Sequence, residues 1–462
     1  MTRHRPSRGV IAAALALASA LTLWTAAHLR PPVHGVVVIT LDTTRADRLP
    51  VYGFDGVRTP AIDRVAREGV VFDDVTSVAP LTFPAHASLF TGNLPLHHGV
   101  RDNAGGSLPM AQVTLAERLH ARGWRTAAFV SAVVLRSGRG LDRGFDRYSA
   151  PSPAACPGGT LRRRGDRVVT DALDWLAAAR SDPFFLWIHL YDAHRPYELP
   201  AREPYARSPY LGAISFLDEQ IGRVLTYLDR EGLARTTAVV IAGDHGEGLG
   251  DHGEQAHGIF VYQSVLHVPL LMHVPGVAPR RVLGPTSLVD VMPTLLELTG
   301  LPVIPSDGVS LAAAMRAGAS HRAPEVYAES LYPQRFGWSG LRSLRDERYK
   351  VIAAPRAELY DLQRDPVEQS NIIDARPAVA RAMLARLAVY DSAPAGKPAE
   401  EGVDSQTADE LAALGYVGAA APQTPAASGS TSADPKDHIA EFERFQASRL
   451  RLTQACTDAP SR

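Results

Sequence analysis

Aspartate, histidine and threonine residues recur where the sequence predicts that buried strands end or a helix begins. Asp42 directly follows the apolar run Val36–Leu41, and Thr82 lies two residues before Pro84 at the start of a helical segment. Ligands of open α/β sheets collect at the carboxyl ends of parallel strands, and a helix N-terminus favours an anion. The sequence therefore predicts that Asp42 and Thr82, the latter as the N-cap of its helix, belong to one site.

Two later strands end in side chains of the same kinds. The apolar run 183–191 is followed by Asp192 and His194, and the run 237–242 is followed by Asp244 and His245, with His257 further along the chain. Capping explains any single one of these residues well. Three strands that end in Asp, or in Asp and His, favour a shared site over independent surface residues.

The residue types indicate metal-assisted chemistry on an anionic ester. A threonine hydroxyl is protonated at neutral pH and is a weak nucleophile until a metal or a base activates it. We expect Asp42, Asp244 and His245 to bind a divalent metal ion, with Thr82 beside it as the activated nucleophile. The mixed oxygen and nitrogen donors favour zinc or manganese and leave calcium and magnesium open.

The remaining polar residues near these positions allow more than one role. Asp192, His194 and His257 form a second metal site, or the two histidines hold substrate oxygens and protonate the leaving group. His86 follows Thr82 by one helical turn and is expected to orient it or to contact the anion. His189 alternates along a buried strand and is interpreted as a core histidine. Arg45 is interpreted as the ion-pair partner of Asp47 at a helix start.

Composition limits the class of protein. The chain has 462 residues, 45% hydrophobic and 21% charged, with a net charge of −1, so it is globular and offers no electrostatic basis for binding nucleic acid. Residues 1–30 combine a basic start with an uncharged run and are read as a signal peptide or an N-terminal membrane anchor, which places the remainder on the extracytoplasmic side. Cys156 and Cys456 form a disulfide or remain free thiols.

The order of predicted elements indicates an α/β fold followed by smaller units. Strand-like and helical segments alternate over residues 34–320, which we expect to be the catalytic domain. Residues 321–395 change to strands with polar turns and a closing helix at 377–389, which indicates a small antiparallel subdomain. Residues 396–436 form a tail with an Ala/Pro-rich linker, and residues 437–462 form one helix with nothing of its own to pack against.

Several segments together resemble the sulfatase family of the alkaline phosphatase superfamily. The segments are LDTTRAD, TFPAHASLFTG, YDAHRPY, GDHGEGLGDHGEQAHG, SLVDVMPTLLELTG and LYDLQRDPVEQSN, in that order between residues 36 and 374. The resemblance implies a large, mostly parallel mixed sheet sandwiched by helices, with a small C-terminal antiparallel subdomain. It also places Asp42, Asp244 and His245 at metal-ligand positions and Thr82 at the nucleophile position.

The sequence departs from the family pattern at the nucleophile. Sulfatases have Cys or Ser in a C/S-x-P-x-R motif that is converted to formylglycine, whereas residues 82–86 here read Thr-Phe-Pro-Ala-His. Thr43 replaces the second Asp of the usual pair, and His257 stands where the family has a lysine. The resemblance then implies a nucleophilic Thr82 without formylglycine, as in the threonine-dependent phosphodiesterases, phosphonate hydrolases and phosphoethanolamine transferases of the superfamily.

The sequence as a whole predicts an exported, metal-dependent hydrolase that cleaves a small sulfate or phosphate ester. A phosphodiesterase, a phosphonate hydrolase or a phosphoryl-group transferase is the alternative within the same chemistry. A non-catalytic anion-binding or scaffold protein is the alternative from a different class. The number of metal ions, the natural substrate and the oligomeric state stay open at this point.

Overall fold

The computed structural model describes residues 33–104, 106–151, 162–197, 208–317, 325–391, 396 and 433–457. The predicted export segment, Cys156 and the Ala/Pro-rich linker lie outside these ranges, as does the side chain of Cys456. Within the described ranges, no helix is both long enough and apolar enough to cross a bilayer.

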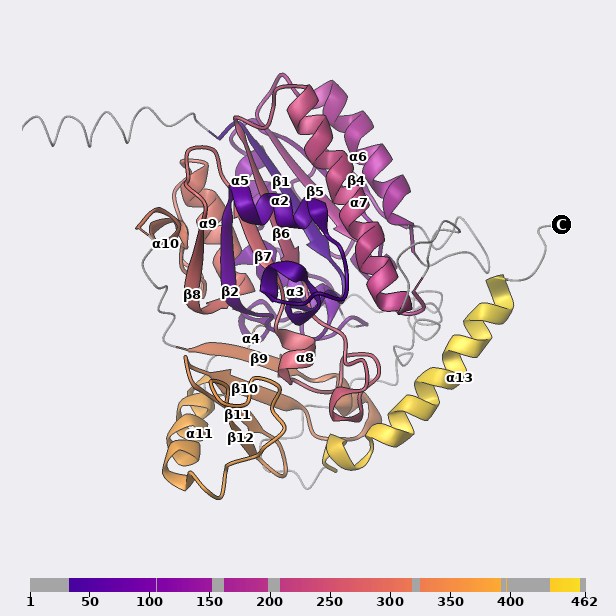
Figure 1. Cartoon of the computed structure of the whole chain (residues 1–462), viewed down its shortest axis with the longest axis vertical. Coiled ribbons are helices and arrows are strands. Elements are labelled where there is room, and N and C mark those ends of the chain that lie inside the picture. The colour runs from indigo at the N-terminus through magenta and orange to yellow at the C-terminus, as the bar shows by residue number, and fades with distance from the viewer. Residues whose placement is uncertain are drawn as a thin grey trace, which may run out of the picture.

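An eight-stranded sheet forms the centre of the molecule (Figure 1). Its strand order is β4-β3-β5-β1-β6-β7-β2-β8, and only β7 runs antiparallel to its neighbours. The three central strands are continuous apolar runs that are buried on both faces, as expected inside a parallel sheet. The strands are β1 (Gly35–Leu41), β2 (Val70–Thr76), β3 (Arg125–Val130), β4 (Arg147–Ser149), β5 (Phe184–Leu190), β6 (Thr237–Gly243), β7 (Leu270–His273) and β8 (Arg280–Ser287).

Helices cover both faces of this sheet. Val37 and Ile39 of β1 pack toward α2 (Pro60–Glu68), α6 (Gly165–Ala179) and α7 (Pro209–Arg230). Val36 and Val38 point to the opposite face, which is covered by α3 (Thr82–Thr91), α5 (Leu115–His120) and α9 (Val291–Leu298). The fold is therefore the predicted large, mostly parallel sheet between helices, which confirms the expected fold class.

A four-stranded antiparallel sheet forms the C-terminal part below the large sheet in Figure 1. Its order is β12-β11-β10-β9, and α11 (Pro377–Asp391) packs against β10 and β11. The strands are β9 (Val326–Ser330), β10 (Leu341–Arg345), β11 (Tyr349–Ala353) and β12 (Glu358–Asp361). The described chain also contains the short helices α4 (Pro95–His98), α8 (Gln263–Leu266) and α10 (Ala312–Ala317).

The C-terminal helix α13 (Ile439–Thr457), which the sequence predicts as a helix with no partner of its own in the tail, packs against distant parts of the chain. Its Phe442 is buried and contacts Tyr332 and Phe336 through edge-to-face ring pairs. Glu443 accepts a hydrogen bond from the backbone N–H of Gln255, at 2.8 Å. The first turns of α13 are thus fixed against the segment that leads to His257. Local sequence patterns could not predict these contacts, because they join residues about a hundred to two hundred positions apart.

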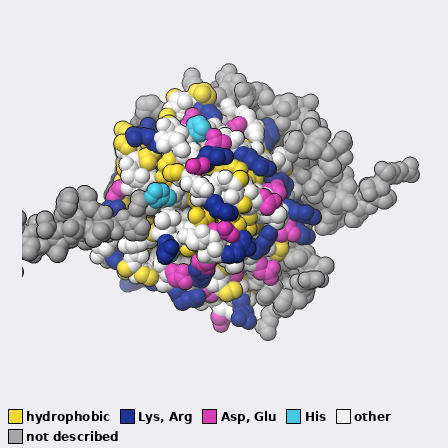
Figure 2. Space-filling view, turned by 90° about the horizontal axis from the view of Figure 1, so that it is seen from above, with side chains coloured by type: hydrophobic (Ala, Val, Ile, Leu, Met, Phe, Trp, Pro, Cys, Tyr) yellow, Lys and Arg dark blue, Asp and Glu magenta, His cyan; other side chains and the backbone are white. Residues whose placement is uncertain are grey.

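Acidic and basic side chains are interspersed on the face of the molecule that Figure 2 shows. This mixture agrees with the net charge of −1, and it gives the face no single sign of charge.

Candidate active site

Strand register brings the two predicted metal-binding segments together. β1 and β6 are parallel neighbours with Leu41 opposite Gly243, so Asp42 and Asp244 leave the sheet side by side. The backbone N–H of Asp244 donates to the carbonyl of Leu41 (3.4 Å), which continues the pairing to the strand ends. The carboxyl ends of two central strands therefore present two carboxylates at one point, as the sequence predicted.

Thr82 lies in contact with both segments. Its Oγ1 donates to Asp42 Oδ2 at 3.3 Å and is 3.2 Å from His245 Nε2. All three side chains are buried. The structure corrects the local prediction in one respect: Leu81 is the N-cap residue of α3, and Thr82 is its first helical residue. Thr82 does not use its hydroxyl to cap the helix, so the hydroxyl is left to face the carboxylates.

The site contains buried carboxylate oxygens that have no partner. Asp42 Oδ1 and Asp244 Oδ2 make no hydrogen bond to any residue that the structure describes, whereas Asp244 Oδ1 accepts from the backbone N–H groups of Thr43 (3.2 Å) and His245 (2.7 Å). Burial raises the pKa of Asp42 to about 7, and burial followed by repulsion from Asp42 raises the pKa of Asp244. Unpaired buried carboxylates are costly without a counter-charge.

These residues fit a divalent cation. One donor atom from each of Asp42, Asp244 and His245 lies within 4.8 Å of the others, and Thr82 Oγ1 is next to this group. Oxygen and imidazole donors at this spacing suit a transition-metal ion such as zinc or manganese.

His194 and His257 stand beside this group. The His257 ring lies 4.4 Å from that of His245 between centroids, and the His194 ring lies 4.9 Å from that of His257. His194 Nδ1 is 2.6 Å from the carbonyl oxygen of Arg195, which can only accept, so Nδ1 carries the proton. Its Nε2 is then an unprotonated nitrogen, and it is buried without a partner. Burial lowers the pKa of His194 well below its ordinary value and keeps the ring neutral.

His257 is paired with a buried glutamate that the sequence analysis did not single out. His257 Nδ1 lies 3.0 Å from Glu247 Oε1. Burial raises the pKa of Glu247 to about 8 and lowers the pKa of His257 to about 3. Burial therefore favours the neutral form of both groups, and this allows a protonated Glu247 to donate to Nδ1 while His257 keeps its N–H at Nε2. A glutamate three residues after Asp244 gives no sequence signal of this role.

Asp192 does not join the histidines. Both of its carboxylate oxygens lie within hydrogen-bonding distance of the backbone N–H of Gly165 (3.1 and 3.2 Å), at the start of α6. Burial raises its pKa to about 7. Among the described residues, neither group with metal-binding geometry includes Asp192, so the structure does not bring together a second metal site of Asp192, His194 and His257. A strand-end position predicted the place of Asp192 but not the direction of its side chain.

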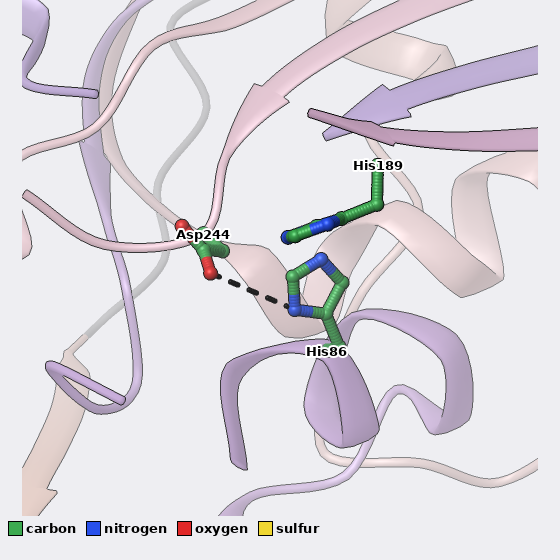
Figure 3. Close-up of side chains that lie close together, drawn as sticks. All are labelled: His86, His189 and Asp244. Carbon is green, nitrogen blue, oxygen red and sulfur yellow. Dashed lines mark ion pairs between the residues drawn. The ribbon is translucent and has the colours of Figure 1, made fainter. Parts of the chain in front are cut away.

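His86 and His189 lie on the other side of the carboxylates (Figure 3). His86 Nδ1 is 2.7 Å from the carbonyl oxygen of Thr82, and Nε2 is 2.9 Å from Thr40 Oγ1, so His86 supports Thr82 through its backbone. His189 Nε2 is 3.2 Å from Asp42 Oδ2, so this residue contacts the site as well as the core. Strand register could have indicated the contact between His189 and Asp42. His189 is opposite Thr40 in the β1–β5 pairing, and it therefore lies on the same face of the sheet as Asp42.

The interpretation of Arg45 is confirmed and extended. Arg45 forms ion pairs with Asp47 and Asp251, at 2.8 Å each, and its Nη1 also donates to the carbonyl of Glu247 (3.1 Å). The buried guanidinium thus holds the loop that follows β6, and this loop carries Glu247.

Comparison with known proteins shows to which family the chain belongs. The sulfatase family model matches residues 34–301, and a model for the C-terminal part of N-sulphoglucosamine sulphohydrolase matches residues 250–389. Steryl-sulfatase of Mus musculus is 26% identical over 78% of this chain and 83% of its own length. Choline-sulfatase of Rhizobium meliloti (strain 1021) is 25% identical over 73% of this chain and 82% of its own length.

Solved structures share the fold. A protein in complex with its substrate D-glucosamine-2-N,6-O-disulfate superposes with a TM-score of 0.67 at 21% identity, covering 79% of this chain and 99% of that one. Phosphonate monoester hydrolase of Agrobacterium radiobacter superposes with a TM-score of 0.64 at 21% identity, covering 78% of this chain and 95% of that one.

The fold, the strand-end carboxylates and these likenesses define a hydrolase of ester bonds with an alkaline phosphatase-like architecture. The chain belongs to the sulfatase family, whose model covers more than half of its length.

Proposed function

We propose that this sulfatase-family hydrolase cleaves a sulfate or phosphate ester with Thr82 as nucleophile and without formylglycine. The observation that carries the proposal is the position of Thr82 Oγ1, 3.3 Å from Asp42 Oδ2 and 3.2 Å from His245 Nε2. Asp42, Asp244 and His245 would hold a divalent cation, zinc or manganese by donor type. When bound, the cation supplies positive charge that favours the deprotonated hydroxyl and the anionic ester.

The first step transfers the acid group to the protein. Thr82 Oγ1 gives its proton to Asp42 Oδ2 and attacks the sulfur or phosphorus atom, and the bond from that atom to the ester oxygen breaks. His257 Nε2–H protonates the departing alcohol oxygen. Glu247 then passes its proton to His257 Nδ1, so the imidazole stays neutral. The products are a free alcohol and an ester of Thr82.

The second step returns the protein to its starting state. A threonine ester lacks the second hydroxyl with which a formylglycine hydrate expels sulfate, so water must attack the sulfur or phosphorus atom. His194 Nε2 carries a lone pair and has no protein partner, so it is placed to accept the proton of that water. The Thr82 oxygen leaves and takes back the proton held by Asp42 Oδ2, and sulfate or phosphate is released. Transfer of the extra proton from His194 to the Glu247–His257 pair restores both groups to their starting states. An alcohol in place of water would make the same chemistry a group transfer.

A substrate panel tests the proposal. The purified protein is assayed with aryl sulfate, phosphate monoester, phosphodiester and phosphonate ester substrates, beside Thr82→Ala and Thr82→Ser. We expect at least one ester to be turned over, a loss of about a thousandfold or more in Thr82→Ala, and substantial recovery in Thr82→Ser.

The outcomes separate the alternatives. Turnover of sulfate alone that survives Thr82→Ala would contradict the proposed nucleophile. Binding of a metal ion without turnover of any ester in the panel would favour an anion-binding or scaffold protein. Preference for diesters or phosphonates would assign the chain to the phosphoryl branch of this chemistry, where the phosphonate monoester hydrolase of Agrobacterium radiobacter also has this fold.

We also propose that residues 1–30 direct the chain out of the cytoplasm and tether it there, on the sequence pattern alone. Fractionation of cells that express the full chain should find it with the membrane on the extracytoplasmic side, accessible to added protease. Recovery in the cytoplasmic fraction would contradict this proposal and leave the catalytic one unaffected.

A further inference from the structure

We propose that Glu443 of the C-terminal helix α13 is a positioning residue for His257, and that it thereby sets which esters the enzyme can cleave. The inference rests on the proposed function, in which His257 protonates the departing alcohol. Esters of poorly acidic alcohols need that proton, whereas nitrophenyl esters do not. The contact between α13 and the loop of His257 is therefore a determinant of leaving-group specificity.

His257 and Glu247 stand opposite each other at the base of a short backbone hairpin. The N–H groups of residues 248–250 donate to the carbonyl groups of residues 254–256, at 2.6 to 3.2 Å. The pair closest to the site directly adjoins Glu247 and His257, whose side chains meet at 3.0 Å. The geometry of this hairpin therefore sets the contact between the two side chains.

The hairpin has few side chains of its own to hold it in place. Leu249 and Ala256 are the apolar residues between positions 248 and 256, and the others are polar or glycine. Gly250 and Gly253 have φ angles of 95° and 85°, which the turn at the tip requires. A lone hairpin without an apolar face is marginally stable. Contacts from outside must therefore keep this hairpin in one geometry.

α13 supplies such contacts next to His257. The backbone N–H of Gln255 donates outside the hairpin ladder, to Glu443 Oε1 at 2.8 Å. Ile439, the first residue of α13, lies against the tip, since a Cβ atom at Gly253 would be 3.3 Å from Ile439 Cγ2. Figure 1 shows the first turns of α13 beside the loop that precedes α8. The backbone two residues before His257 is thus fixed by the C-terminal helix.

α13 is itself anchored, so Glu443 is a fixed acceptor. Phe442 is buried, and its ring lies 6.0 Å from that of Tyr332 between centroids. Just before the helix, the His438 ring stacks on Trp338, at 5.0 Å and with 12° between the planes. The two anchors hold the first turns of α13 to the segment between β9 and β10.

Tyr332 extends the same support to the other side of His257. A Cβ atom at Gly258 would lie 3.1 Å from Tyr332 Cδ1, so the Tyr332 ring packs against the residue that follows His257. Phe442 holds Tyr332 from the opposite side. Adjacent residues of α13, Phe442 and Glu443, therefore support the chain both before and after His257.

Hydrogen–deuterium exchange on the full chain, without substrate, tests the positioning. Water can replace the acceptor that Glu443→Ala removes, so we expect this variant to stay folded while the hairpin loses its fixed geometry. Peptides that cover residues 254–260 should exchange about tenfold faster or more, and peptides of β1 and β6 should keep their wild-type rates. Phe442→Ala removes the anchor of α13 and should give the same local increase.

Two further variants separate the hydrogen bond from the helix as a whole. Glu443→Gln keeps a carbonyl oxygen that can accept from Gln255, so it should restore most of the protection. Glu441→Ala is the matched control, because Glu441 lies two residues earlier on α13 and is exposed. It should exchange as the wild type does.

Steady-state kinetics with a series of leaving groups tests the effect on specificity. In Glu443→Ala and Phe442→Ala we expect kcat to fall about tenfold for esters of poorly acidic alcohols, with little change for nitrophenyl esters and in KM. An equal loss for all leaving groups would overturn the inference, because it would mean that α13 supports the site as a whole and not the acid.

The results distinguish this inference from the proposed function. Unchanged exchange at residues 254–260 in both Glu443→Ala and Phe442→Ala, with Thr82-dependent turnover intact, would overturn the role of Glu443 alone. Turnover that survives Thr82→Ala would contradict the proposed nucleophile, and the exchange rates would still decide whether Glu443 holds the hairpin. Thermal unfolding of each variant shows whether it is folded.

Discussion

Glu247 and His257 show how burial shifts the pKa values of two neighbouring side chains in opposite directions. Burial raises the pKa of Glu247 to about 8 and lowers the pKa of His257 to about 3, so burial favours a protonated glutamate beside a neutral histidine. In the proposed reaction His257 would then present N–H to the ester oxygen, whereas His194 would present an unprotonated nitrogen. Two adjacent imidazoles can therefore act as acid and as base in successive steps.

Glu247→Gln tests this division of roles. A glutamine side chain can still donate to His257 Nδ1, but it cannot pass on a proton when Nε2 protonates the alcohol. We expect kcat to fall by about 10- to 100-fold for esters of poorly acidic alcohols and to change little for nitrophenyl esters, whose leaving groups need no proton. Steady-state kinetics across a series of leaving groups measures the difference.

Tyr197→Phe is the control for Glu247→Gln, because the Tyr197 hydroxyl makes a long contact with Glu247 (3.4 Å) and takes no part in the transfer. It should leave the dependence of kcat on the leaving group as in the wild type. An equal loss in Glu247→Gln for all leaving groups would instead mean that Glu247 has a structural role.

At the scale of elements, the site depends on the loop that joins β6 to α8. Buried Glu254 organises this loop by accepting hydrogen bonds from the backbone N–H groups of Ile259 (2.8 Å) and Phe260 (3.3 Å). Arg45 binds the loop from one side, and Glu443 of α13 binds it from the other. The position of His257 is thus set by Glu254 within the loop and by contacts from two distant parts of the chain.

Glu254 predicts a pH dependence of stability. Burial raises its pKa from 4.5 to about 8, so the folded chain holds a proton on Glu254 that the unfolded chain has released in this interval. The stability gained from this proton is fully present below pH 4.5 and is lost as the pH rises through about 8. Over this interval the free energy of unfolding falls by roughly 1 kcal/mol for each pH unit. Glu254→Gln should therefore show a smaller fall in Tm between about pH 5 and about pH 8 than the wild type.

Thermal unfolding followed by circular dichroism at matched metal content measures this change. Glu219→Gln replaces an exposed glutamate on α7 and should keep the pH dependence of the wild type. A steeper fall in Tm for Glu254→Gln than for the wild type would show that Glu254 is ionised in the folded chain.

The elements that could be predicted are those that local sequence specifies. Thr59 and Pro60 mark the start of α2 and Gly69 its end, and the apolar runs of β1, β5 and β6 require burial whatever surrounds them. β2 and β8 were not predicted, because Asp73 and Asp74 interrupt the apolar pattern of β2 and Gly284 and Pro285 that of β8. β8 tolerates these residues as the edge strand of the sheet.

The positions of the candidate site residues could be predicted where they depend on the end of a strand. Asp42, Asp244, His245 and Thr82 come together because neighbouring parallel strands end at one edge. Asp192 and His189 were interpreted less well. Their roles depend on the direction of a side chain and on strand register, and a strand end specifies neither. That information is a property of the assembled sheet.

At the scale of the whole molecule, buried charged side chains of the small sheet contact the large domain. Lys350 of β11 is fully buried and lies 2.8 Å from Glu368 Oε1 and 3.4 Å from Gln263 Oε1, beside α8. Arg345 of β10 makes a second link, to Asp74 of β2 (2.6 Å). The C-terminal subdomain is therefore attached by charges that have little access to water.

Lys350→Met should destabilise the protein strongly. The substitution preserves the length of the side chain but leaves the Glu368 carboxylate buried and unpaired, at a cost of about 3–5 kcal/mol. Chemical unfolding monitored by tryptophan fluorescence measures the loss. Arg348→Ala is the control, because the Arg348 side chain is exposed, and it should change the unfolding midpoint far less. Equal effects of the two substitutions would contradict the role of the buried pair.

Rapid quenching gives the most direct test of Thr82 as the nucleophile. The enzyme is mixed with the ester that it turns over best, stopped in acid within the first turnovers, digested and analysed by mass spectrometry. The account predicts a peptide containing Thr82 that carries one sulfuryl or phosphoryl group, and no such adduct in Thr82→Ala. Turnover with an adduct on another residue, or undiminished turnover in Thr82→Ala, would contradict it.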